Sequence, residues 1–196
     1  MSVRVVLATH NRGKAQEFQE LLGREVPGLE IVTYEGPEPV EDGTSFEENA
    51  LIKARAAASH TGLPALADDS GICVDVMGGA PGIFSALWSG THGDAQANIR
   101  LLLAQLADIR DEDRTAHFTA TLALVVPGGE PTLVQGVWPG RIAREPRGEH
   151  GHGYDPIFLP DGHDRTAAEL TLQEKNAESH RARALAAIVP ALRELG

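Results

Sequence analysis

Apolar residues recur along this chain with two different periods, which predict an alternation of strands and helices. Residues 3–8 form a short, almost continuous apolar run that is typical of a buried strand. Shortly afterwards, Phe18, Leu21 and Leu22 recur at helical spacing within residues 13–26, so one face of a helix is apolar there. The chain therefore begins with a strand that is followed by an amphipathic helix.

Capping residues mark the boundaries of the later helices. Ser45 and Glu48 have the spacing of a capping box, and Gly62 supplies a stop signal. Thr171 and Glu174 repeat this spacing before the last helix, which we expect to run without a break. The helices expected in this part of the chain span residues 45–62, 95–109 and 171–189.

Strand-like apolar segments separate these helices. They are expected at residues 30–34, 64–67, 72–76, 117–126, 132–138, 140–143 and 155–160. A turn at residues 127–131 is expected to join two of them as a hairpin. Because hairpins and helical crossovers both occur, we predict an α/β fold class with a mixed sheet.

The composition limits the classes of function. The 196 residues, 42% of them hydrophobic and 23% charged, suit one domain, or two small lobes around one core. A net charge of −11 argues against broad binding to nucleic acid or anionic membranes, although a local group of cations could still hold a small anion. The single cysteine, Cys73, excludes an internal disulfide and fits a reducing cytoplasm, and no segment has the length of a signal peptide or a membrane span.

The turn between the first strand and the first helix has the features of an anion site. Thr9, Asn11 and Lys14 surround the start of the helix, where free amides and one cation would face a phosphate. The spacing is not that of a Walker A loop. An asparagine cap with a solvated lysine explains the pattern equally well, so the residues by themselves leave both interpretations open.

Two neighbouring carboxylates, Asp68 and Asp69, follow an apolar run and precede Ser70 and Gly71. Neighbours on a strand point to opposite faces, so both aspartates would enter one pocket only if the strand ended there, and Ser70 and Gly71 favour such an end. Carboxylates at a strand end suit ligation of Mg²⁺ or activation of a water. The alternative is a turn aspartate with a capping neighbour, but the apolar approach to this pair favours a functional role.

Other polar side chains each have two interpretations. Lys53 lies among small apolar residues of its expected helix and either reaches a cleft or is a surface lysine. Tyr154, between glycines, either stacks on a base or packs within its loop. The charged segment at residues 174–181 either contacts a ligand or forms a solvated face. The histidines are scattered and show no zinc pattern.

Five motifs, taken in order, resemble those of the inosine triphosphate pyrophosphatase family, which acts on non-standard purine nucleotides such as dITP, ITP and XTP. They are TxNxxK (residues 9–14), SFEENALIKA, ADDSGICVDVMGGAPGIFSA, WPGRIAREPRGEHGHGYDPIF and LTLQEKNAESHRARAL. Each motif is weak alone, but five in the right order over nearly the whole chain are specific. This sequence departs from the family at His152, where the family usually has phenylalanine. The departure affects the apolar part of the expected contact with the base.

The resemblance implies an elongated, two-lobed α/β fold around a central mixed β-sheet with flanking helices, and an active-site cleft between the lobes. It implies a single nucleotide pyrophosphatase domain over residues 1–196 and a homodimer. The implied activity is Mg²⁺-dependent hydrolysis of ITP, dITP and XTP to the monophosphate and pyrophosphate, which cleanses the nucleotide pool in the cytoplasm. The implied partner is a purine nucleoside triphosphate, with no nucleic acid and no membrane.

The resemblance also implies a role for each matching residue. Asp69 would be the catalytic carboxylate, and Lys53 would neutralise phosphate charge. Glu41 and Asp69 would ligate the metal, with Asp68 as a third candidate. The residues implied to contact the substrate are Thr9, His10, Asn11, Arg12, Gly13, Lys14, Ser70, His152, Gly153, Tyr154, Asp155, Lys175, His180 and Arg181.

Two rival functions remain open at this point. Maf-like pyrophosphatases, which act on modified pyrimidine nucleotides, share this general architecture, although residues 174–181 favour a purine. A non-catalytic nucleotide sensor would keep the pocket without turnover, but the presence of Glu41, Lys53 and Asp69 argues against it.

Overall fold

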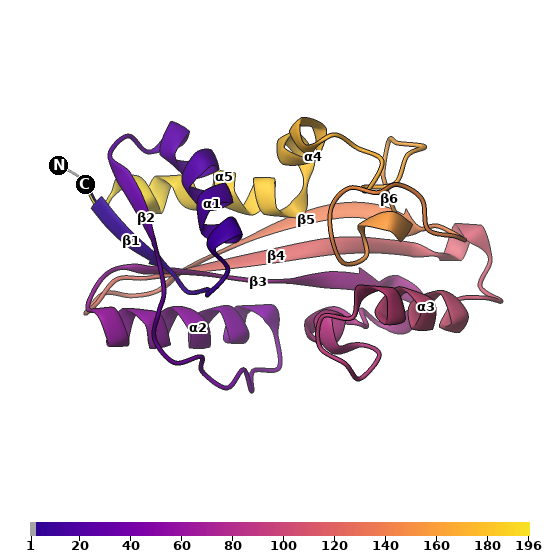
Figure 1. The fold of residues 1–196 in the computed structure, drawn as a ribbon, viewed down its shortest axis with the longest axis horizontal. Helices are drawn as coiled ribbons and strands as arrows, with labels where there is room; N and C mark the ends of the chain where they lie inside the picture. Colours follow the sequence, from indigo (N-terminus) through magenta and orange to yellow (C-terminus); the bar gives the residue numbers. More distant parts are fainter. Residues whose placement is uncertain (1–2) are drawn as a thin grey trace. The chain divides into compact units, whose positions relative to one another are not determined.

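A computed structural model describes residues 3–196, apart from the side chains of residues 12 and 13. Its strands are β1 (Val3–Leu7), β2 (Leu29–Thr33), β3 (Ala65–Val74), β4 (Thr115–Val125), β5 (Thr132–Ile142) and β6 (Phe158–Pro160). Its helices are α1 (Arg12–Glu25), α2 (Phe46–Thr61), α3 (Ala95–Gln105), α4 (Leu172–Glu178) and α5 (His180–Arg193) (Figure 1). Short 3-10 turns lie at Asp75–Met77, Gly82–Leu87, Asp111–Asp113 and Asp155–Ile157.

The strands form one mixed sheet in the order β2-β1-β3-β4-β5-β6. β1 is parallel to both β2 and β3, and the helices α1 and α2 provide the crossovers that parallel pairing needs. β5 and β6 are antiparallel. The predicted α/β fold class with a mixed sheet and flanking helices is therefore confirmed.

The chain divides into two compact units. Among the described residues, the first unit contains 3–69 together with Ala120–Gly136 and Arg183–Gly196. The second unit contains Ser70–Thr119 and Val137–Ala182. The strands β3, β4 and β5 each contribute residues to both units, because the chain passes from one unit to the other within them.

In the first unit, helices cover both faces of the sheet, with α1 and α5 on one side and α2 on the other (Figure 1). Leu66 of β3 packs with Phe18 of α1 and Leu185 of α5. Its neighbours Ala65 and Ala67 lie in clusters with alanines of α2 instead. Since α2 presents mainly alanines to the sheet, its backbone can approach closely, and the alternation along β3 decides which helix each side chain meets.

The second unit has its own apolar core, which includes Ile72 of β3, Leu102 of α3 and Trp138 of β5. Gly140 shows why a glycine is needed where β5 pairs with β6, since a Cβ there would lie 2.3 Å from the carbonyl oxygen of Leu159. The buried Arg114 donates to three backbone carbonyls that belong to Leu106, Ile142 and Ala143. In residues 3–196 there is no helix with the length and apolar character of a membrane span.

Two predictions of a break between strands are wrong. The segments predicted on either side of Asp68 and Asp69 are one continuous strand, β3, which runs through Ser70 and Gly71. Residues 132–138 and 140–143 are likewise one strand, β5. Ser70 and Gly71 suggested an end to the first strand, and Pro139 separated the two segments of the second. Ladder pairing depends on the backbone, however, and neighbouring strands continue it past these positions. By contrast, the late strand is shorter than predicted and contains only Phe158–Pro160.

The prediction of a single C-terminal helix is also wrong, because the helical segment divides at Ser179 into α4 and α5. Ser179 is extended, with φ −63° and ψ 164°, and its Oγ accepts a hydrogen bond from the N–H of Ala182 at 3.2 Å. Serine competes well for such a capping role, which ends one helix and begins the next. α5 then continues past Pro190 to Arg193. The break makes His180 the first residue of α5.

Candidate active site

A lysine and two carboxylates form a compact polar group in the first unit. Lys53 projects from α2, and its Nζ lies 2.8 Å from Oδ1 of Asp69 and 3.0 Å from Oε2 of Glu41. The side chains of Lys53 and Asp69 are only 15% and 14% exposed. We call these three residues the Lys53 cluster. The surface-lysine interpretation of Lys53 does not fit this placement.

Burial and charge shift the pKa values of the cluster. Burial raises the pKa of Asp69, the ammonium of Lys53 lowers it, and the negative charges of Glu41 and Asp68 raise it again, so that it lies above its ordinary value. Burial lowers the pKa of Lys53, but the charges and hydrogen bonds of Asp69 and Glu41 outweigh this effect and raise it overall. Lys53 therefore stays charged, while Asp69 is a stronger base than a solvated aspartate.

Asp68 faces away from this cluster. Its side chain is completely buried, and its Oδ2 lies 2.7 Å from Nζ of Lys14, which projects from α1. Because Asp68 and Asp69 are neighbours in a strand, they point to opposite faces of the sheet and meet different helices. Each aspartate therefore forms an ion pair with a different lysine, and the two side chains do not enter one pocket.

Local hydrogen bonds organise the turn before α1. Asn11 is the N-cap, and its Oδ1 accepts from the N–H of Lys14 at 3.1 Å. Thr9 Oγ1 in turn accepts from the N–H of Asn11 at 3.1 Å. The capping interpretation of Asn11 is therefore correct, but Lys14 is not a solvated lysine, because it is paired with Asp68. An anion site at this turn stays a prediction, and for Arg12 and Gly13 it lies outside the described side chains.

His10 is tied to a neighbouring loop. Its Nε2 lies 2.9 Å from the carbonyl oxygen of Gly36, and its Nδ1 lies 3.0 Å from Oε1 of Glu38. Its ring stacks on Tyr34, with centroids 5.7 Å apart. His10 thus connects the turn before α1 to the loop that leads to Glu41. Its predicted contact with substrate stays a prediction.

In the second unit, Asp155 is the centre of the predicted nucleotide contacts. Its buried carboxylate forms an ion pair with the ammonium of Lys175, and its Oδ2 accepts the N–H of His152 at 2.8 Å. Gly151 is required here, because a Cβ would lie 2.1 Å from Oδ2 of Asp155. Gly153 follows with φ +61°. These contacts fix the loop that contains His152 and Gly153.

Tyr154 packs inside the second unit. It is buried, and its hydroxyl donates to the carbonyl oxygen of Ser85 at 2.8 Å. Burial raises the pKa of this phenol. Ser85 also accepts the N–H of Ile72 at its Oγ, at 2.9 Å. The packed-loop interpretation of Tyr154 therefore fits better than a stacked base, and sequence reasoning missed Ser85, whose only signal was its place after the glycine-rich turn.

His180 lies among aromatic rings of the second unit. It is buried, and its imidazole stacks on Phe118 with centroids 4.7 Å apart and on Trp138 at 6.3 Å. Arg181 follows it at the start of α5 and is half-buried. The alternation of apolar residues in β4 and β5 places Phe118 and Trp138 facing inward, but nothing in the sequence indicated that they meet His180.

The predicted site residues therefore form separate groups in the two units. The Lys53 cluster and the Lys14–Asp68 pair belong to the first unit. The group around Asp155 and Lys175 belongs to the second unit, as does Ser70, a half-buried residue that follows Asp69. The predicted cleft between two lobes stays a prediction.

Metal ligation was predicted for Glu41, Asp69 and Asp68. Across residues 3–196, no three His, Cys, Asp or Glu side chains gather in a way that could hold a metal ion. Glu41 and Asp69 nevertheless converge on one cationic group, the ammonium of Lys53. Two converging carboxylates fit Mg²⁺, which is commonly bound by one or two carboxylates together with the phosphates of a substrate.

The mixed sheet and the paired lysines and carboxylates define an α/β protein with a polar site built on the central strand β3. Comparison with known proteins gives the family. The chain belongs to the Ham1 family, whose model matches residues 5–191. The resemblance inferred from the five motifs is thereby confirmed.

Individual relatives cover almost the whole chain. A protein from Leifsonia xyli, named dITP/XTP pyrophosphatase, is 78% identical over 98% of this chain and 97% of its own length. One of the same name from Streptomyces coelicolor is 53% identical, covering 98% of both chains. Among solved structures, a HAM1 protein from Coxiella burnetii has a TM-score of 0.90 at 45% identity, covering 98% of this chain and 99% of that one.

Proposed function

We propose that this protein hydrolyses the triphosphates of non-standard purine nucleosides, namely ITP, dITP and XTP, to the monophosphate and pyrophosphate. We predicted from the sequence that the protein is an enzyme of the nucleoside triphosphate pyrophosphatase class. Its relatives, which are named dITP/XTP pyrophosphatase, confirm this prediction. The observation that carries the proposal for this chain is the Lys53 cluster, in which a half-buried aspartate of raised pKa lies 2.8 Å from a half-buried ammonium. The role in cleansing the nucleotide pool follows from this choice of substrate.

Asp69 is assigned as the general base. Its Oδ1 is held by Lys53, which leaves Oδ2 to take a proton from the attacking water. The water oxygen then forms a bond to the α-phosphorus, and the bond from that phosphorus to the bridging oxygen breaks, which releases pyrophosphate. A carboxylate whose pKa is raised toward the working pH accepts this proton more readily than a solvated aspartate.

Cationic side chains are assigned to the phosphates. Lys53 is the ammonium nearest to Asp69, so it is positioned to stabilise the negative charge that develops during attack. Thr9, Asn11 and Lys14 surround the first turn of α1, where backbone amides favour an anion. Asp68 orients Lys14 from the core of the unit.

Mg²⁺ is the proposed cofactor, and Glu41 and Asp69 are the residues that would hold it, because their carboxylates already converge. The resemblance also proposes Asp68 as a ligand, but its carboxylate points to the opposite face of β3, where Oδ2 lies 2.7 Å from Nζ of Lys14. When bound, Mg²⁺ would neutralise part of the triphosphate charge, which bare carboxylates would otherwise repel. The protein's own contribution is to fix these carboxylates and to keep Lys53 charged beside them.

The base is assigned to the second unit. His152 and Gly153 lie on the loop fixed by Asp155, and His180 and Arg181 begin α5. Donors that face the 6-carbonyl of hypoxanthine or xanthine would reject adenine, whose 6-amino group would leave them unpaired. Ser70 and Lys175 complete the proposed contacts with the nucleotide, and Tyr154, which packs inside the unit, supports the loop.

The decisive experiment is to incubate the protein with a panel of nucleoside triphosphates and to measure released pyrophosphate. We expect rapid release from ITP, dITP and XTP with Mg²⁺, little from ATP and GTP, and none in excess chelator. A preference for modified pyrimidine nucleotides would favour the Maf-like activity instead. Tight binding of ITP without pyrophosphate release would identify a nucleotide sensor.

Two further expectations, a homodimer and a cytoplasmic location, are proposed on the resemblance and on the single cysteine. Sedimentation equilibrium of the purified protein measures the first, and a mass equal to that of one chain would contradict it. Fractionation of the producing cell measures the second.

A further inference from the structure

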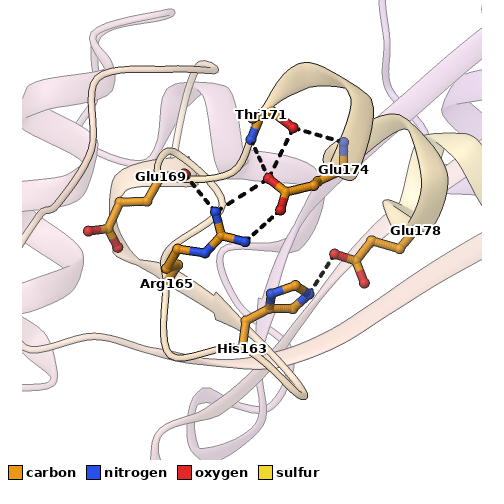
Figure 2. A network of polar contacts seen from close by, with 6 residues as sticks. All are labelled: His163, Arg165, Glu169, Thr171, Glu174 and Glu178. Carbon is orange, nitrogen blue, oxygen red and sulfur yellow. Dashed lines mark hydrogen bonds and ion pairs between the residues drawn. The ribbon is translucent and has the colours of Figure 1, made fainter.

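The short helix α4 is held at both ends by side chains from one preceding segment (Figure 2). At its first turn, Nη2 of Arg165 lies 2.6 Å from Oε1 of Glu174, and Nη1 lies 3.3 Å from Oε2. At its last residue, Oε1 of Glu178 lies 2.7 Å from Nε2 of His163. We call these four residues the α4 brace.

Glu174 connects the brace to the start of the helix. Its Oε2 accepts the N–H of Thr171 at 2.8 Å, and Oγ1 of Thr171 accepts the N–H of Glu174 at 3.2 Å, which completes a capping box (Figure 2). The hydrogen bond from Arg165, followed by those from Thr171, lowers the pKa of Glu174 to about 2. The carboxylate is therefore ionised at any physiological pH and remains a partner for Arg165.

Apolar packing does not hold this helix in place. None of the residues of α4 is buried, and Leu172 at its start is 71% exposed. The helix has 7 residues, which is too short for a helix to be stable in isolation. Its position consequently depends on polar contacts, and the brace supplies them at both ends.

The residue between these contacts is one that the proposed function uses. Lys175 directly follows Glu174, and its ammonium forms an ion pair with the buried carboxylate of Asp155. The same carboxylate accepts the N–H of His152. A displacement of α4 would therefore move Lys175, release Asp155 and loosen the loop that contains His152. The brace residues belong to the second unit, whereas Asp69 and Lys53 belong to the first.

We propose that Arg165 is a positioning residue, which acts through Glu174 and α4 to place Lys175 for nucleotide binding, with His163 in the same role at the other end of the helix. The proposal rests on the proposed function, in which Lys175, Asp155 and His152 contact the nucleotide. It predicts an effect on nucleotide affinity that is separate from the chemistry at Asp69.

The kinetic test compares Arg165→Ala and Arg165→Lys with the wild type, using ITP and Mg²⁺. The matched control is Arg110→Ala, since Arg110 also forms an exposed ion pair, with Asp113, but lies outside the brace. We expect Arg165→Ala to raise KM by roughly two- to fivefold, the worth of about one exposed ion pair. The kcat should stay within about twofold, because only uniform binding is lost.

The conservative variant and the control decide between positioning and general stability. Arg165→Lys keeps a cation but loses the two-pronged contact, so it should recover part of the KM effect. Arg110→Ala should leave both constants unchanged. An unchanged KM in Arg165→Ala, a fall in kcat alone, or an equal rise in KM in Arg110→Ala would overturn the proposal.

A second measurement keeps the proposal testable if the wild type hydrolyses no nucleoside triphosphate, an outcome that would refute the proposed function by itself. Amide hydrogen exchange of His152 and of Lys175–Ser179 should be roughly two- to fivefold faster in Arg165→Ala than in the wild type. Exchange near Asp69 should not change. Equal exchange of His152 and α4 in both proteins would overturn the positioning role, whatever the activity.

Discussion

Asp68 and Asp69 are neighbours in β3, yet each forms an ion pair with a lysine from a different helix. Asp68 meets Lys14 of α1 at 2.7 Å, and Asp69 meets Lys53 of α2 at 2.8 Å. Successive side chains of a strand point to opposite faces of the sheet, so the two carboxylates lie apart. One is completely buried and organises a lysine, while the other keeps a raised pKa and is partly accessible.

Replacing Asp69 by asparagine should abolish most of the activity and preserve the fold. Loss of a general base costs roughly 10²–10⁴-fold in kcat, and the amide keeps the size of the side chain. Pyrophosphate release and the melting temperature measure the two effects. Asp42→Asn, an exposed neighbour of Glu41, is the control and should behave as the wild type. Turnover near the normal rate in a folded Asp69→Asn protein would remove Asp69 from the catalytic role.

The same variant tests the raised pKa of Asp69 through stability. The folded state holds the proton more tightly than the unfolded state, whose aspartate pKa is about 3.9. Wild-type stability should therefore fall, relative to Asp69→Asn, as the pH rises from that value through the folded pKa, and the difference should be constant above it. Urea unfolding of both proteins at a series of pH values measures this difference. A wild type that gains stability over the variant as the pH rises toward about 3.9 would show that the pKa is lowered instead.

Lys53→Met should reduce turnover more than stability. The helix keeps its Ser45 cap and its alanine face, and methionine occupies similar space, but the ammonium between Asp69 and Glu41 is lost. We expect kcat to fall by roughly 10²–10³-fold, as for removal of one strong electrostatic contact in a transition state. Arg55→Met, on the exposed side of α2, is the matched control. A collapse of the melting temperature specific to Lys53→Met would identify a structural lysine.

Lys14→Met should destabilise the fold, in addition to any loss of the proposed phosphate binding. Removing the ammonium beside the fully buried Asp68 leaves a carboxylate without its cation, which costs roughly 1–3 kcal/mol or more. The unfolding free energy from urea denaturation measures the loss. The double variant Lys14→Met with Asp68→Asn should recover part of it, because the buried charge is gone. Additive losses in the double variant would mean that the two side chains act independently.

Arg181→Ala should narrow the preference for ITP over ATP. Arginine offers several fixed donors and cannot lose its charge, so it suits the 6-carbonyl of hypoxanthine. We expect kcat/KM for ITP to fall and that for ATP to change much less. The measurement is kcat/KM for both nucleotides in the wild type and the variant. A constant ratio would assign base recognition elsewhere, for example to backbone groups of residues 152–155.

The sequence by itself determined the features that depend on local interactions. The helix α2 begins after Ser45 and ends before Gly62 as predicted, because capping and the left-handed conformation of a glycine act within a few residues. The capping box of Thr171 and Glu174 was predicted for the same reason. The α/β class followed from the periods of the apolar residues. The family followed from five ordered motifs, which list residue types but carry no geometry.

Only the tertiary structure decided how these residues meet. Nothing near Asp68 and Asp69 in the sequence shows that β3 continues past them, since the pairing that extends it comes from distant strands. The partners of both aspartates also come from elsewhere, Lys14 lying 54 positions before Asp68 and Lys53 16 positions before Asp69. The stacking of His180 on Phe118 has the same origin. Local propensity fixes where a helix can begin, whereas burial and charge pairing across the fold fix which side chains share a site.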